Sequence, residues 1–366
     1  MLMQIFDDAP ERTRGKVAGM YAILIAANIA AWLWAWIEFR DNALLLGTAF
    51  LAYSFGLRHA FDADHIAAID NITRKLMQEG RRPIAVGFFF SLGHSSVVVG
   101  LVLAIALTTT ALQNRFDALK AIGSVIGTSM SAVFLLAIAA ANIVVLIQVY
   151  RALQAARRGG RLVEEDVNQI LARSGLLGRL FRPAFALIGR SWHAYPLGFL
   201  FGLGFDTATE IGLLGISAAQ AAQGLSIWSI LVFPALFTAG MSLLDATDST
   251  VMVGTYGWAF VRPIRKLYYN MTITLASVVA ASVIGGIEVL GLIGDKFGFE
   301  GPFWRLIAAL GDNFGLVGYA IIAFFIASWA VSYLLYKAMG YDRIEAAASA
   351  GFLPLGKPLG KQSELP

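Results

Sequence analysis

The chain contains no cysteine, and this absence excludes several kinds of chemistry. Disulfide bonds, zinc–thiolate sites and thiol catalysis all need a cysteine sulfur. A carrier of Cu(I), which is a soft ion, would need cysteine or clustered methionine as well. Any metal chemistry in this protein therefore has to use nitrogen and oxygen ligands.

Charged residues are also scarce. They make up 14% of the chain, whereas hydrophobic residues make up 58% and the mean hydropathy is +0.68. Soluble domains carry about 25% charged residues, so the composition indicates a membrane protein whose main partner is the lipid bilayer. The net charge of +4 is small, and no basic patch alternates with aromatic residues, which argues against a nucleic-acid partner.

Apolar segments long enough to cross a bilayer recur along the chain. The first follows a mixed polar N-terminus and is longer than the core of a signal peptide, which favours a retained helix. The sequence thus predicts an all-α membrane protein, a polytopic bundle of about eight transmembrane helices. The predicted spans lie at residues 17–37, 43–73, 84–111, 121–149, 195–220, 227–256, 270–294 and 314–337.

Lysine and arginine are distributed between the loops in a way that predicts the topology. Cytoplasmic loops are enriched in these residues, and the basic segments here precede the first, third, fifth and seventh predicted spans and follow the eighth. Both termini are therefore predicted to be cytoplasmic. The predicted loop before the third span contains Arg74, Lys75, Arg81 and Arg82, and residues 150–194 contain eight arginines.

The long basic loop divides the chain into four predicted regions. Residues 1–149 form an N-terminal half with four transmembrane helices, and residues 195–340 form a C-terminal half with four more. Residues 150–194 form a cytoplasmic Arg-rich loop between them. Residues 341–366 are rich in Gly, Pro and Lys, which is typical of a flexible cytoplasmic tail.

The second predicted span carries a cluster of ionisable residues, Arg58-His59-Ala60-Phe61-Asp62-Ala63-Asp64-His65. Such a group at the bilayer centre costs about 2.5–3.5 kcal/mol even on the most lenient insertion scale, so the cluster needs pairing, water or a bound ion. Histidine and aspartate without sulfur are ligands for a borderline divalent metal. On a straight helix, His59, Asp62 and His65 fan across about 120° of one side. Asp64 could join them only if the helix were distorted, and Asp70 falls near the azimuth of His59, one or two turns further along.

Three other predicted spans place polar residues at similar depth, where transporter sites usually lie. These residues are Ser91, His94 and Ser95 in the third span, Asp206, Thr207, Thr209 and Glu210 in the fifth, and Asp245, Thr247 and Asp248 in the sixth. The three of the third span share one helix face. The paired acids of the fifth span need a proton or a cation between them. Alternatively, the buried acids pair with Arg58 or with Ser and Thr hydroxyl groups.

These motifs resemble those of the nickel/cobalt transporter family (NiCoT), eight-span permeases of bacteria and some fungi. The family signature in the second span, Arg/Lys-His-Ala-x-Asp-Ala-Asp-His-Ile, is complete here from Arg58 to Ile66. Further matches occur in family order at residues 90–95, 203–210 and 240–245. The sixth-span motif of the family usually continues as Asp-Thr-x-Asp-Gly, whereas this chain has Asp245-Ala246-Thr247-Asp248-Ser249, so both acids are kept and one hydroxyl is lost.

The resemblance implies high-affinity, low-capacity uptake of Ni²⁺ or Co²⁺, which are transported substrates, and it implies no cofactor. The metal ligands of this hypothesis are His59, Asp62, Asp64, His65 and His94. The transport path and its supports are Arg58, Asp70, Ser91, Ser95, Asp206, Thr207, Thr209, Glu210, Asp245, Thr247 and Asp248. Arg58 is expected to balance the acids rather than to bind a cation.

Two alternatives stay open on the residues alone. A metal exporter of a related family would have a long His-rich loop, whereas residues 150–194 contain only His193. An intramembrane metalloenzyme is disfavoured, because the cluster is not the His-Glu-x-x-His of a metalloprotease. An ATPase is not implied, because Pro358 replaces the Ser/Thr that a phosphate loop at residues 351–357 would require. The prediction is a secondary transporter that imports the metal across the bacterial cytoplasmic (inner) membrane.

Overall fold

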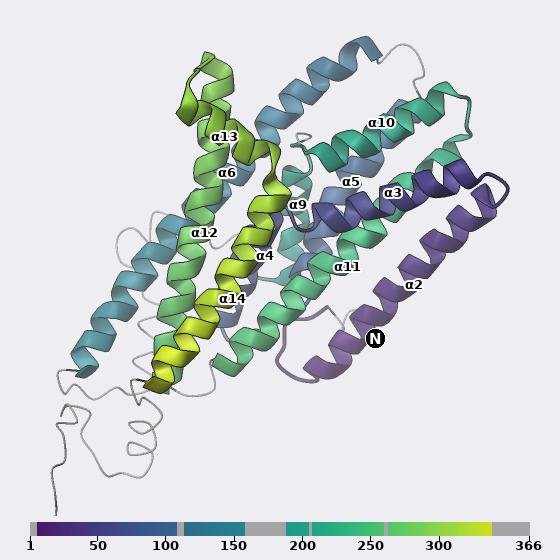
Figure 1. The fold of residues 1–366 in the computed structure, drawn as a ribbon. Coiled ribbons are helices and arrows are strands. Elements are labelled where there is room, and N and C mark those ends of the chain that lie inside the picture. Colours follow the sequence, from purple (N-terminus) through teal and green to yellow (C-terminus); the bar gives the residue numbers. More distant parts are fainter. Residues whose placement is uncertain (1–5, 108–112, 158–187, 205–206, 260–262, 339–366) are drawn as a thin grey trace, which may run out of the picture.

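The computed structural model describes residues 6–107, 113–157, 188–204, 207–259 and 263–338. Within these ranges all regular structure is helical, as the sequence predicts (Figure 1). The α-helices are α2 (Thr13–Phe39), α3 (Ala43–His59), α4 (Ala63–Gln78), α5 (Val86–Leu107), α6 (Gln113–Arg157), α9 (Ala194–Phe201), α10 (Ala208–Ala222), α11 (Ile227–Ala259), α12 (Pro263–Phe297), α13 (Pro302–Asp312) and α14 (Phe314–Ala338). A short 3-10 helix, η1 (Ser191–His193), precedes α9.

Six of these helices are long and apolar enough to cross a membrane, namely α2, α5, α6, α11, α12 and α14. They coincide with six of the eight predicted spans, which confirms the prediction of a polytopic helical bundle. Large apolar side chains on their outer faces are exposed, for example Trp36 on α2 and Leu334 on α14. Such faces are expected where a helix packs against lipid rather than against protein.

The other two predicted spans are interrupted. The segment 43–73 is divided into α3, of 17 residues, and α4, of 16 residues. The segment 195–220 is divided into α9, of 8 residues, and α10, of 15 residues. A helix needs about 20 residues to cross the hydrocarbon core, and each of these four is shorter than that. The expectation of one continuous helix in each segment was therefore wrong, and the count of eight crossings stays a prediction.

Local sequence explains both interruptions. Asp62 has an extended backbone (φ −65, ψ 144) immediately before α4, and its side chain contacts His59 rather than capping the helix. Asp64 follows in the first turn, where the positive end of the helix dipole favours a carboxylate. In the fifth span, Gly202 follows the last residue of α9, and Thr207, also extended (ψ 142), precedes α10.

The first and last described helices begin and end on one side of the bundle. The start of α2, the end of α6 and the end of α14 all lie at its lower end in Figure 1. This arrangement fits a topology in which the two termini share a compartment. The compartment itself and the four-region division of the chain stay predictions, and residues 158–187 and 341–366 of that division lie outside the described part of the chain.

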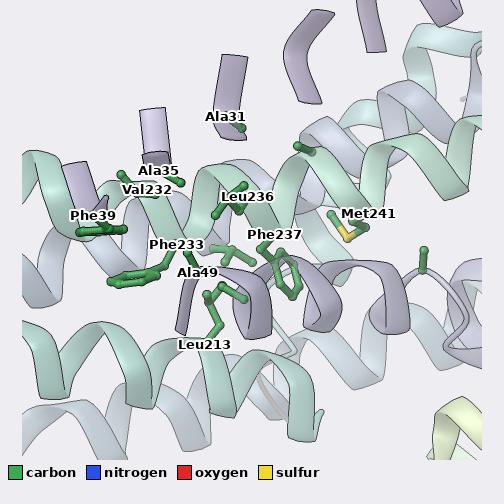
Figure 2. Close-up of a cluster of buried hydrophobic side chains, with 14 residues drawn as sticks. Ala31, Ala35, Phe39, Ala49, Leu213, Val232, Phe233, Leu236, Phe237 and Met241 are labelled. Carbon is green, nitrogen blue, oxygen red and sulfur yellow. The ribbon is translucent and has the colours of Figure 1, made fainter. Parts of the chain in front are cut away.

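Helix α11 occupies the centre of one half of the bundle. Figure 2 shows its side chains Phe233 and Phe237 among buried residues of α2, α3 and α10. The rings of Phe39 and Phe233 stack with centroids 5.5 Å apart, and the remaining members of this cluster are largely alanine and leucine. Because α11 packs on α2, α3, α4, α5 and α10, it brings the sixth-span motif against the other motif-bearing helices.

Helices α5 and α9 approach each other closely. A Cβ atom on Gly93 would lie 1.9 Å from the backbone oxygen of Tyr195, and one on Gly198 would lie 2.0 Å from that of Phe90. Real side-chain atoms do not come so close, so both positions require glycine at this separation. The prediction that Gly93 permits close helix packing is confirmed, and the contact sets His94, one residue further along α5, beside the interrupted fifth span.

Candidate metal centre

Three histidines from three helices meet inside the bundle. His59 ends α3, His65 lies in the first turn of α4, and His94 lies in the middle of α5. Their ring centroids are 4.6 Å, 4.7 Å and 4.8 Å apart, and all three side chains are at most 2% exposed. One ring nitrogen from each lies within 4.8 Å of the others, a spacing at which the three could hold one metal ion.

The interruption between α3 and α4 makes this convergence possible. His59 precedes the break and His65 follows it, so the two rings approach from different helix axes rather than along one face. Asp62, in the break itself, is 4% exposed, and its Oδ2 lies 2.7 Å from His59 Nδ1. The sequence required a distorted helix for the cluster to converge, and the structure provides one. Asp64 is partly exposed in the first turn of α4.

Carboxylates hold two of the histidine rings by their Nδ1 atoms. Asp62 contacts His59 Nδ1, and Asp245 Oδ2 on α11 lies 3.2 Å from His65 Nδ1. With the proton on Nδ1, each ring donates to its carboxylate and directs the Nε2 lone pair away from it. The Nε2 atom of His65 is buried and has no hydrogen-bond partner among the described residues. Histidine ligands in metal sites are commonly held by carboxylates in this way.

A fourth residue, Glu210 on α10, completes the geometry. Its Oε1 lies 2.8 Å from His94 Nε2 and 3.9 Å from His59 Nε2, and the two Nε2 atoms are 3.0 Å apart. The point equidistant from these three atoms lies about 2.0 Å from each of them, which is the length of a bond from a divalent first-row metal to nitrogen or carboxylate oxygen. The sequence assigned Glu210 to the transport path, whereas the structure sets it among the histidines.

The threonines of the fifth-span motif support this group. Thr207 donates a hydrogen bond to Glu210 Oε2 at 2.9 Å, so one oxygen of this carboxylate is held while the other faces the imidazoles. Thr209 Oγ1 lies 3.2 Å from His59 Nδ1. Glu210 is also in the first turn of α10, where the helix dipole favours its negative charge. Asp206 lies outside the described residues.

The predicted residues of α5 and α11 differ in how close they come to the histidines. Ser91 is buried and donates to Ser242 Oγ at 3.0 Å, which links the two helices beside the site. The Oγ of Ser95, the Oδ1 of Asp245 and the Oδ2 of Asp248 are buried and have no hydrogen-bond partner among the described residues. These atoms form a set of polar groups available to a cation or to water.

Two predicted residues make no hydrogen bond or ion pair to the histidines among the described residues. Thr247 accepts a hydrogen bond from Tyr21 on α2 at 2.9 Å and donates to the Leu243 backbone oxygen at 2.7 Å. Arg58 is exposed at the end of α3, and no carboxylate in the described part of the chain lies within 4.0 Å of its guanidinium. Its expected ion pair with the buried acids is therefore not formed within the described residues.

Asp70 belongs to a second buried polar group, further along α4. Its carboxylate accepts hydrogen bonds from the Tyr256 hydroxyl on α11 and from Ser277 Oγ on α12, the latter at 2.7 Å. One turn on, Arg74 is 1% exposed and donates to Thr274 Oγ1 and Asn71 Oδ1, both at 3.1 Å. Assigning Arg74 to a cytoplasmic loop was wrong, because α4 continues to Gln78 through the interior of the bundle.

Sequence reasoning did not find the partners in this second group. These partners are Tyr256 on α11 and Thr274 and Ser277 on α12. The sequence alone does not show which sides of α11 and α12 face α4. The opposite charges of Asp70 and Arg74, four residues apart, were the available signal, because such residues share a face of a helix. Continuing the helical pattern beyond Thr73 would have placed Arg74 with Asp70.

A helical membrane bundle with two interrupted spans around buried imidazole and carboxylate groups defines a membrane transporter for a metal ion. Residues 45–335 match the protein family described as high-affinity nickel-transport protein, and the chain belongs to that family. Members of this family are transporters rather than enzymes, which removes the metalloenzyme alternative.

Similar proteins cover nearly the same length. A high-affinity nickel transport protein of Cupriavidus necator is 58% identical over 337 residues, which are 92% of this chain and 96% of that protein. The high-affinity nickel-transport protein NixA of Helicobacter pylori is 41% identical, over 84% of this chain and 92% of its own. The cobalt transport protein NhlF of Rhodococcus rhodochrous is 40% identical, over 87% and 91% respectively. No solved structure matches the chain.

Proposed function

We propose that this protein imports Ni²⁺, and Co²⁺ as a second substrate, across the bacterial cytoplasmic membrane through the group of His59, His65, His94 and Glu210. The observation that carries the proposal is the set of separations between His59, His94 and Glu210, which fit around one divalent ion. The printed names of the relatives, nickel transporters and one cobalt transporter, support the two substrates.

In this proposal the imidazoles take the place of water around the ion. Ni²⁺ and Co²⁺ accept nitrogen and oxygen ligands, and the site is buried, so an arriving ion exchanges its hydration shell for His59, His65 and His94. Asp62 and Asp245 keep His59 and His65 in the tautomer that presents Nε2 to the ion. The carboxylates also offset the charge of a divalent cation that would otherwise be too costly to bury.

The interrupted helices contribute to the binding of a cation. Helix α3 ends at His59 and helix α9 ends at Phe201, and the carbonyl ends of helices carry partial negative charge. Broken spans that direct such ends at a mid-membrane site are common in secondary transporters. Helices α4 and α10 begin at the same breaks with their positive ends, which offset this charge, so the half-helices contribute mainly by supplying the ligands.

The path away from the imidazoles follows the buried acids of α11. Asp245 contacts His65 directly, and Asp248, one turn along, has a buried oxygen without a hydrogen-bond partner among the described residues. Ser91, Ser95 and the predicted ligand Asp64 supply further oxygen atoms near this route in the proposal. In this proposal the Asp70 carboxylate accepts hydrogen bonds from Tyr256 and Ser277, so it lies at the end of the path and does not bind the ion.

The driving force in this proposal is the electrochemical gradient. A membrane potential of 100 mV, negative inside, favours entry of a divalent cation by about 4.6 kcal/mol. This corresponds to a concentration ratio of more than a thousandfold at equilibrium. No nucleotide-binding subunit is required for such an importer.

The proposal is tested by metal uptake in cells that express the wild-type chain, His59→Ala, His65→Ala or His193→Ala. His193 is the matched control, because its ring accepts a hydrogen bond from the Gly189 backbone N–H rather than joining the site. Wild-type cells and His193→Ala cells should accumulate radiolabelled nickel, and the two site variants should not. Accumulation at the wild-type rate by His59→Ala and His65→Ala cells would refute the site.

The same cells decide the direction and the substrates. An importer raises cellular nickel above that of cells without the gene, whereas an exporter lowers it and protects against metal toxicity. Excess unlabelled Co²⁺ should compete with nickel uptake, and Mn²⁺ and Zn²⁺ should compete less. Lower nickel content on expression would establish the efflux alternative instead.

A further inference from the structure

Helix α14 carries none of the family motifs, yet it packs directly on the break between α3 and α4. A Cβ atom on Gly318 would lie 1.7 Å from the backbone oxygen of Phe61, in the middle of the break. The ring of the next residue, Tyr319, lies 5.1 Å from the ring of Phe61. One turn earlier, a Cβ atom on Gly315 would lie 3.4 Å from Asp62 Oδ1. Residues 61 and 62 therefore rest on α14.

The position of this break determines the position of the metal ligands. The backbone N–H of Asp62 donates to the His59 carbonyl oxygen at 2.9 Å, and the Asp62 side chain holds the His59 ring at 2.7 Å. His59 Nε2 in turn lies 3.0 Å from His94 Nε2. A shift of the Phe61 backbone is thus passed on to His59 through two hydrogen bonds from Asp62.

We propose that Gly318 is a positioning residue of the metal site: its backbone contact with Phe61 fixes the turn between α3 and α4 and thereby sets His59 against His94 and Glu210. This inference rests on the proposed function. It assigns a role in metal binding to the eighth predicted span, which sequence motifs left without one.

The size of the effect follows from the contact distances. A methyl carbon and a carbonyl oxygen approach to about 3.3 Å at closest, so a Cβ at position 318, 1.7 Å from the Phe61 oxygen, would displace that carbonyl by about 1.6 Å. Metal ligands tolerate errors of about 0.2 Å. Even when most of the displacement is absorbed elsewhere, His59 leaves the ligand geometry, and we expect Gly318→Ala to weaken metal binding at least tenfold.

The test is direct binding of Co²⁺ to the purified full-length protein in detergent, followed by the visible ligand-field absorption of the bound ion. Thermal unfolding without metal is measured in parallel. Gly286→Ala on α12 is the matched control, because no heavy atom lies within 4 Å of its added Cβ. Gly315→Ala is an intermediate case, since its Cβ would make an ordinary contact with Asp62.

The expected result separates positioning from general stability. Gly318→Ala should bind Co²⁺ at least tenfold more weakly and with a shifted absorption band, while Gly286→Ala should match the wild-type protein in both. A merely structural role would lower the unfolding temperature and leave the affinity and the spectrum of the folded fraction unchanged. That pattern, or wild-type binding by Gly318→Ala, would overturn the proposal.

A second variant keeps the proposal testable if Gly318→Ala does not fold. Tyr319→Leu removes the ring contact with Phe61 without adding volume, and it should weaken Co²⁺ binding severalfold and shift the band. Unchanged affinity and spectrum in Tyr319→Leu would overturn the inference while leaving the proposed function intact. A wild-type protein that binds no Co²⁺ would overturn both.

Discussion

The substitution Asp62→Asn tests how much of the metal affinity depends on the carboxylate behind His59. Asp62 is 4% exposed and its Oδ2 lies 2.7 Å from His59 Nδ1. The amide has nearly the same shape and can still accept a hydrogen bond through its oxygen, but it carries no charge. The change therefore removes electrostatic support from the imidazole and leaves the packing intact.

The magnitude follows from the role of such partners in metal sites. Loss of a residue that holds a metal-binding histidine costs 10–100-fold in affinity, or about 1.4–2.7 kcal/mol. Thr209 Oγ1, 3.2 Å from the same nitrogen, can replace part of the lost interaction. We therefore expect the nickel concentration for half-maximal uptake to rise about tenfold, near the lower limit of that range.

The assay is initial-rate uptake of radiolabelled nickel over a range of concentrations, in cells with matched expression. Asp41→Asn is the control, because the Asp41 side chain is 95% exposed between α2 and α3, and it should leave the half-saturating concentration unchanged. An unchanged value in Asp62→Asn would refute the reasoning, since the carboxylate would then contribute nothing. A loss as complete as that of His59→Ala would also contradict it, because the imidazole itself remains.

Two further predictions concern residues outside the metal site. The Lys16 ammonium is hydrogen-bonded to the Asp7 carboxylate and lowers the pKa of Asp7 below its ordinary value. The contact of residues 6–10 with Lys16 should therefore persist above about pH 4 and weaken as the pH falls through the lowered pKa of Asp7. Hydrogen exchange of residues 6–10, corrected for intrinsic rates, measures this change. The substitution Arg74→Met leaves the Asp70 carboxylate buried without a compensating charge, and it should lower the free energy of unfolding in detergent by about 3 kcal/mol.

Each of these predictions has an internal control. Lys16→Met removes the partner of Asp7, so the pH dependence of exchange in residues 6–10 should become flat, and a persistent transition would assign it to another group. For the second, the double substitution of Asp70→Asn with Arg74→Met removes both charges and should recover part of the lost stability. Simple additivity of the two single losses would show that the charges do not compensate each other.

The sequence alone predicted that the histidines converge. It did not predict the break between α3 and α4 that allows them to do so. The spacing of His59, Asp62 and His65, together with His94 at a similar depth, indicated one site, and the structure brings the three rings within 4.8 Å of one another. The break itself was inferred only as a distortion, because helical periodicity treats each apolar segment as one straight helix. Asp64 in the first turn of α4 was the local signal, since the positive end of a helix favours a carboxylate.

The residues that could not be predicted depend on contacts between distant segments. Glu210 was recognised as a buried acid, but its approach to His94 follows from the packing of α5 on α9 and α10. Gly318 had no signal at all, because its role depends on which backbone lies opposite it. The pattern of one sequence shows which face of its own helix a residue lies on. It does not show which residue of another helix packs against that face.

The three imidazole rings come from separate helices, and a bound ion should therefore affect the stability of the folded protein. An ion bound by His59, His65 and His94 would link α3, α4 and α5 for as long as it stays bound. A ligand that binds only the folded state, at 100 times its dissociation constant, adds about 2.7 kcal/mol to stability. In cells short of nickel, the folded state of this chain would then be at its least stable. Adding the ion to the purification buffer would slow unfolding of the protein in detergent.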